Sequence, residues 1–69
     1  MDYINIGMVD NISEKNIQLF DSTGRLVLQR NMAADSNLEV LEVNHLPSGI
    51  YWIKVEVDGR SFNNKILLQ

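Results

Sequence analysis

Between Gly49 and Gly59 this 69-residue chain alternates apolar and polar residues more strictly than anywhere else. One set of alternate positions holds Tyr51, Ile53, Val55 and Val57, and the other holds Ile50, Trp52, Lys54 and Glu56. A period of two residues is typical of a β-strand that packs one face on a core. Before it, Pro47 fixes φ and Gly49 can adopt a positive φ. After it, Asp58-Gly59 favours a two-residue type I′ turn, because both central residues of that turn need φ > 0.

A second hairpin is predicted at Asp21-Ser22-Thr23-Gly24. The Asp21 side chain can accept hydrogen bonds from N–H groups ahead of it, and Gly24 can take a positive φ. Other segments with strand-like patterns are 3–8, 17–20, 26–28, 38–43 and 60–69, with Phe62 expected to face inward. The apolar spacing within 38–43 suggests a bulge or a change of sheet. Residues 32–37 are expected to form a crossing loop, because this segment is too short for a stable helix.

These segments predict an all-β fold, an Ig-like or fibronectin-like antiparallel β-sandwich of about six or seven short strands. We expect one domain over residues 1–69. A chain this short buries only about 60% of its unfolded surface. It has no cysteine for a disulfide, and its one histidine, His45, has no thiolate to complete a zinc site. We therefore expect no cofactor and no metal, and stability must come from one core or from docking.

Two classes of partner are excluded, one by charge and one by the lack of a long apolar run. The net charge is −3, with six basic and nine acidic residues spread along the chain. No basic stripe is available for phosphates, so nucleic-acid binding is not expected. No run of about 18 apolar residues exists, so membrane insertion is not expected. Asp35-Ser36-Asn37 and Asp10-Asn11 could offer oxygens to calcium, but solvated loops explain these two clusters better.

Candidate catalytic residues are few, and we expect no enzyme activity. Asp21 and Gly24 flank two hydroxyl residues, but aspartic proteases use a tighter Asp-Thr/Ser-Gly turn that brings two carboxylates together. Ser48 does not lie in a strand-to-helix elbow of the kind that supports a nucleophile. His45 could act as a base, although an exposed residue before a turn is the simpler interpretation.

Two features leave structural and functional interpretations open. Trp52 falls on the polar side of the best strand, where it could cap the sheet against Ile50 or Phe20, or contact a partner. The segment Lys65-Ile66-Leu67-Leu68-Gln69 is apolar on both faces. It could be a strand buried between neighbours or a terminal edge strand that a receptor reads by adding a strand of its own.

Four blocks of sequence, in this order, resemble the type IX secretion system (Por secretion system) C-terminal sorting domain of Bacteroidota. They are Asn16-Ile17-Gln18-Leu19-Phe20-Asp21, Ser22-Thr23-Gly24-Arg25-Leu26-Val27, Leu46-Pro47-Ser48-Gly49-Ile50-Tyr51, and Lys65 just before the final apolar residues. The resemblance covers nearly the whole chain. It implies a structural turn at Gly24 and roles in recognition for Gly49, Tyr51, Lys65 and the terminal strand residues Ile66, Leu67, Leu68 and Gln69.

The resemblance also implies a task and a set of partners. Such a domain is the tail of a larger exported protein, which it directs across the outer membrane. Its partners would be the outer-membrane translocon and its shuttle protein, and then a surface sortase that removes the domain. It would pass through the periplasm and reach the cell surface or the medium. The alternative is an Ig-like adhesion or spacer module that binds protein or glycan near Trp52. The isolated domain could also form a homodimer through an exposed strand edge.

Overall fold

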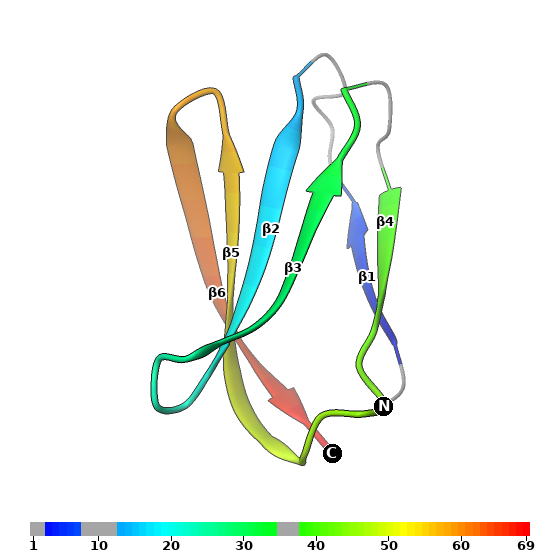
Figure 1. The fold of residues 1–69 in the computed structure, drawn as a ribbon, viewed down its shortest axis with the longest axis vertical. Helices are drawn as coiled ribbons and strands as arrows, with labels where there is room; N and C mark the ends of the chain where they lie inside the picture. The colour runs from blue at the N-terminus through cyan, green and yellow to red at the C-terminus, as the bar shows by residue number, and fades with distance from the viewer. Residues whose placement is uncertain (1–2, 8–12, 35–37) are drawn as a thin grey trace.

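Six β-strands and no helix make up the described part of the chain, residues 3–7, 13–34 and 38–69 of a computed structural model. The strands are β1 (Tyr3–Gly7), β2 (Lys15–Asp21), β3 (Leu26–Met32), β4 (Leu38–Glu42), β5 (Gly49–Val57) and β6 (Arg60–Leu68). They form two antiparallel sheets, one ordered β1-β4 and one ordered β3-β2-β5-β6 (Figure 1). The predicted all-β sandwich is confirmed. The two suggested calcium clusters and Met8 lie outside the described residues.

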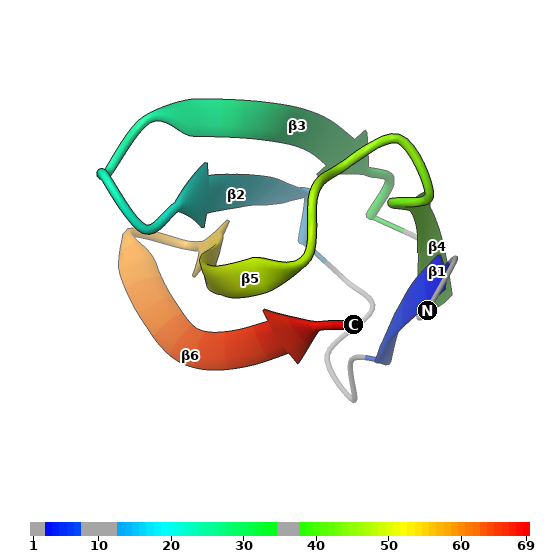
Figure 2. The ribbon, with the colours of Figure 1, turned by 90° about the horizontal axis from the view of Figure 1, so that it is seen from below.

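The two-stranded sheet covers one face of the four-stranded sheet, with β4 toward β3 and β1 toward β6 (Figure 2). The core lies between them. Ile17 and Leu19 of β2 are fully buried at its centre, because β2 has β3 on one side and β5 on the other. The other buried apolar residues of the cluster are Leu28, Met32, Leu41, Val43, Tyr51, Ile53, Val55 and Leu68. Ile4 and Ile6 of β1 pack on this core and are partly buried.

Strand β5 and its turn match the sequence prediction. Tyr51, Ile53, Val55 and Val57 are all buried on the inner face, and the alternate residues face outward. Asp58 has a φ of 51° and Gly59 a φ of 74°, the two positive values that a type I′ turn requires. The Asp58 carboxylate also accepts a hydrogen bond of 2.7 Å from the Ser13 hydroxyl. This bond ties the start of β2 to the β5–β6 hairpin.

The β2–β3 turn is held by the Asp21 carboxylate, as its sequence predicts. Its Oδ1 accepts hydrogen bonds from the Thr23 hydroxyl at 2.6 Å and from the Thr23 and Arg25 backbone N–H groups at 3.0 Å each. The Arg25 side chain lies 3.4 Å from Oδ2. Gly24 takes a φ of 87°, which completes the turn. The hydrogen bond from the Thr23 hydroxyl, with that from the Arg25 N–H, lowers the pKa of the Asp21 carboxyl below its ordinary value.

This lowered pKa predicts how stability depends on pH. The contribution of the Asp21 carboxylate is fully present above its unfolded pKa of 3.8 and is lost as pH falls through the lower folded pKa. Asp21→Asn should therefore lose less stability than the wild type between about pH 5 and pH 2. Urea unfolding midpoints at several pH values measure the difference. Leu26→Ala, at an exposed site without a titratable group, serves as the control and should follow the wild-type profile.

Two sequence predictions are corrected by the structure. Strand β4 pairs with β1 in one continuous register over residues 38–42, so no bulge or change of sheet occurs there. The bulge lies in the β2–β3 pair instead, where Leu19 faces Leu28 and Phe20 faces Leu26, which leaves Val27 as the extra residue. Met32 belongs to β3 rather than to the crossing loop, and it is 1% exposed. Its inner position at the end of a strand gives the small core another apolar side chain.

Lys15 is a buried residue that the sequence did not single out. It lies on the inner side of β2 and is 2% exposed. Its ammonium donates a hydrogen bond of 2.7 Å to the Ser13 carbonyl oxygen. The aliphatic stem can pack on the core while the charged end reaches this carbonyl, which is the usual way for a lysine to lie at the edge of a core.

Candidate functional site

Strand β6 is one of the two edges of the four-stranded sheet, and β3 is the other. Within the described residues β6 pairs with β5 alone, from Arg60 opposite Val57 to Leu68 opposite Gly49. Residues that flank a two-residue turn form a hydrogen-bonded pair, and such pairs then alternate along an antiparallel ladder. The N–H groups that point away from β5 therefore belong to Ser61, Asn63, Lys65 and Leu67. The terminal segment is thus part of an edge strand and not of a strand between two neighbours, and its recognition by a receptor stays a prediction.

The five terminal residues do not share one environment. Leu68 is 3% exposed and belongs to the core, whereas Leu67 next to it is 56% exposed. Lys65 is exposed and Ile66 is half-buried against the core. One side of this segment therefore packs on the core, and the other side is exposed.

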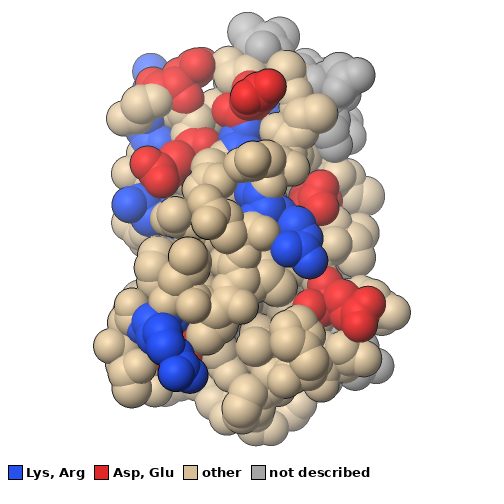
Figure 3. All heavy atoms as spheres, viewed as in Figure 1, with Lys and Arg blue, Asp and Glu red and all other residues tan. Residues whose placement is uncertain are grey.

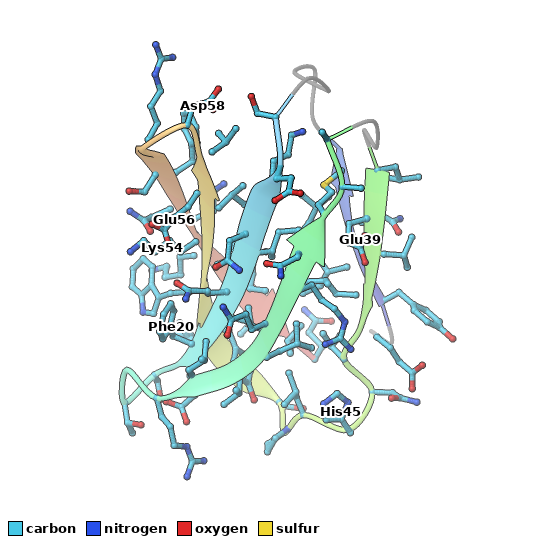
Figure 4. All side chains as sticks on the ribbon, turned by 45° about the horizontal axis from the view of Figure 1, so that its top comes forward. Phe20, Glu39, His45, Lys54, Glu56 and Asp58 are labelled. Carbon is cyan, nitrogen blue, oxygen red and sulfur yellow. The ribbon has the colours of Figure 1, made fainter. Side chains whose placement is uncertain are left out.

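Trp52 lies on the outer face of the four-stranded sheet, in one row with residues of the two neighbouring strands. Its register partners are Phe20 on β2 and Lys65 on β6. The Lys65 ammonium lies 5.9 Å from the centroid of the Trp52 ring, within the range of a cation–π contact. Trp52 remains 46% exposed, and contact of this exposed part with a partner stays a prediction. Figure 4 shows Phe20 of this row, with Lys54 and Glu56 above it.

Tyr51 and Gly49 act at the turn before β5. The Tyr51 ring is 4% exposed, and its hydroxyl donates a hydrogen bond of 2.6 Å to the Pro47 carbonyl oxygen. Gly49 has a φ of 148°, a conformation that side chains rarely adopt. Since the Tyr51 ring is inside the domain, we expect any effect of this residue on recognition to pass through the shape of the turn. Direct contact of Gly49 or Tyr51 with a partner stays a prediction.

The candidate catalytic residues do not come together. The Asp21 carboxylate is committed to its turn, and His45 and Ser48 are exposed. His45 lies near the β4–β5 turn in Figure 4, far along the molecule from Glu56 and Asp58. No group of three His, Cys, Asp or Glu residues that could hold a metal occurs among the residues described. On the face drawn in Figure 3, acidic and basic groups are interspersed and leave no extended basic area.

A groove beside β6 was missed by the sequence analysis. It has a volume of about 720 Å³ and lies between β1 and the inner side of β5 and β6. Its lining residues are Ile4, Asn5, Ile6, Gly7, Ile53, Val55, Phe62, Asn64, Lys65 and Ile66. Phe62 is on the inner side, opposite Val55 in the register, as predicted, but it is 51% exposed rather than buried. The two-stranded sheet does not cover this part of β6.

Comparison with known proteins decides the family. The model of the secretion system C-terminal sorting domain matches residues 1–69. The chain belongs to this family. A search of curated proteins finds no match. The domain is thus the C-terminal sorting signal for type IX secretion, and the match supports this function over an adhesion or spacer module.

Membership of the sorting-domain family has direct consequences. The signal leads to export to the cell surface or to secretion, and the sorting domain interacts with the type IX machinery. The family is a signal family and is not known as catalytic. Within the described ranges there is no helix that is long and apolar enough to cross a membrane.

Proposed function

We propose that the type IX machinery reads this sorting domain through the free edge of β6. The observation that carries the proposal is that β6 is an edge strand with N–H groups of Ser61, Asn63, Lys65 and Leu67 directed away from β5. An added strand gains affinity from such main-chain groups and selectivity from side chains at alternate positions. Lys65 and Leu67 are the exposed side chains closest to the chain end on this edge.

The proposal extends to the route of the protein. The domain over residues 1–69 is the tail of a larger exported protein, which the outer-membrane translocon and its shuttle protein recognise in the periplasm. A surface sortase then removes the tail. Gly24 holds the turn after β2, and Gly49 and Tyr51 hold the turn before β5. Ile66, Leu67 and Leu68, with Gln69 directly after them, form the chain end that is read. The same free edge supports weak self-association of the isolated domain, which sedimentation at rising concentration would detect.

A proline at one edge position tests the proposal. Asn63→Pro removes an N–H group that faces away from β5, and edge strands tolerate proline at such positions. In a type IX-competent host, an exported reporter fused to this variant should lose most of its surface delivery. Asn63→Ala removes only the side chain and should be delivered normally. Circular dichroism of both purified variants verifies that they fold.

Equal delivery of the two variants would exclude pairing at this edge. Ile66→Pro gives a further comparison, because its N–H group faces β5 and its loss breaks the sheet itself. That variant should be unstable as well as undelivered, whereas Asn63→Pro should be stable and undelivered.

A further inference from the structure

The groove between β1 and β6 adjoins the free edge of β6. It is lined by apolar side chains from both sheets, and among the described residues that line it Lys65 is the only charged one. Phe62 exposes 51% of its surface on the inner side of a strand whose partner in the register, Val55, is 8% exposed. A half-exposed aromatic residue beside an open backbone edge is the arrangement that an incoming strand would cover.

The charge of β6 is opposite to that of the whole domain. The chain has a net charge of −3, yet β6 carries Arg60 and Lys65 and no acidic residue. The one ion pair among the described residues joins Arg25 and Asp21, so neither cation of β6 has a carboxylate partner there. Lys65 instead lies over the Trp52 ring on the outer side. Opposite charges across neighbouring strands stabilise a sheet, whereas like charges destabilise it.

We propose that the strand that pairs with the free edge of β6 is a segment of a partner protein in which apolar and acidic residues alternate. Its apolar side chains enter the groove and contact Phe62 and Ile66, and its carboxylates face Lys65 on the outer side. A second copy of this domain fits less well, because its β6 carries two cations and no acidic residue that could face Lys65. This inference rests on the proposed function, since it names the chemistry of the strand that the edge accepts.

A peptide pair tests the inference on the isolated domain. One nine-residue peptide alternates valine with glutamate, and its counterpart alternates valine with lysine. Trp52 is the only tryptophan of the chain and lies beside Lys65, so its fluorescence reports binding at this edge. The glutamate peptide should bind at least about tenfold more tightly than the lysine peptide, and added salt should weaken it. Hydrogen exchange at the Asn63 and Lys65 amides should slow when it is bound.

Matched variants locate the contact. Phe62→Ala and Lys65→Gln should each weaken binding of the glutamate peptide by about fivefold or more. Leu26→Ala removes a similarly exposed apolar side chain, at 44%, from the opposite edge strand and should bind as the wild type does. Equal binding of both peptides, or no effect of Phe62→Ala, would overturn the inference.

Two other occupants of the groove give distinct results. If a second copy is the preferred occupant, the sedimenting mass still rises with concentration in excess glutamate peptide, because the peptide does not displace the second copy. If a preceding part of the native protein fills it, a longer version of the chain no longer binds the glutamate peptide. Either result would overturn the inference. If Asn63→Pro blocks delivery of the reporter while Phe62→Ala and Lys65→Gln do not, edge recognition stands and only the partner chemistry fails.

Discussion

Leu19→Ala should cost about 2–5 kcal/mol of unfolding free energy, the usual range for a buried leucine. Leu19 is fully buried and lies between Leu28 on β3 and Ile53 on β5. A chain of this length has a total stability on the order of 3–10 kcal/mol, so the variant should be largely unfolded or close to it. Urea unfolding followed by Trp52 fluorescence measures the loss.

Leu26→Ala is the control for this prediction. Leu26 is 44% exposed on the outer side of β3 and lies on the edge of the same sheet. Its replacement should change the unfolding free energy by about 0.5 kcal/mol or less. Similar losses in the two variants would contradict the core that the structure defines.

Leu68→Ala and Leu67→Ala should differ strongly although the residues are neighbours. Leu68 is 3% exposed and packs with the core, and Leu67 is 56% exposed on the outer face. We expect Leu68→Ala to lose stability toward the lower end of about 2–5 kcal/mol, because the end of a strand can relax around the gap. Leu67→Ala should stay within about 0.5 kcal/mol of the wild type. Thermal or urea unfolding of the two purified variants gives the comparison.

The contrast between Leu67 and Leu68 also affects the interpretation of deletions at the chain end. Removing Lys65 to Gln69 takes away the end of the β6 edge and, with Leu68, part of the core. Loss of surface delivery after such a deletion could therefore come from unfolding or from loss of recognition. If Leu67→Ala proved as destabilising as Leu68→Ala, the two sides of β6 would not be distinct, and the outer face could not be read independently of the fold.

The inner face of β5 and the two turns that the sequence predicted depend on local rules. Alternation of side chains is built into an extended backbone, so Tyr51, Ile53 and Val55 share a face wherever the strand lies. The positive φ values of Gly24, Asp58 and Gly59 follow from the turn residues in the same way. Local patterns predict such features because neighbouring residues alone determine them.

Predictions that depended on neighbouring strands were less successful. Phe62 lies on the inner side of β6, as alternation along the strand predicts, but the two-stranded sheet does not cover it. A bulge was expected in the 38–43 segment and is absent there. The bulge lies at Val27 instead, where the register between β2 and β3 determines it. Leu38 and Val40, at 55% and 49% exposed, show that apolar residues in a strand need not be buried in so small a sandwich.

By itself the sequence determined the all-β class, the β2–β3 and β5–β6 hairpins, and the family to which the chain belongs. The hairpins are carried by residues that are close together along the chain, and the class and the family by the order of such patterns over nearly its whole length. Only the tertiary structure decided that β6 is an edge, that Leu68 is buried beside an exposed Leu67, and that a groove separates β1 from β6. These depend on which strands pair and how far one sheet extends over the other, and contacts between distant residues set both.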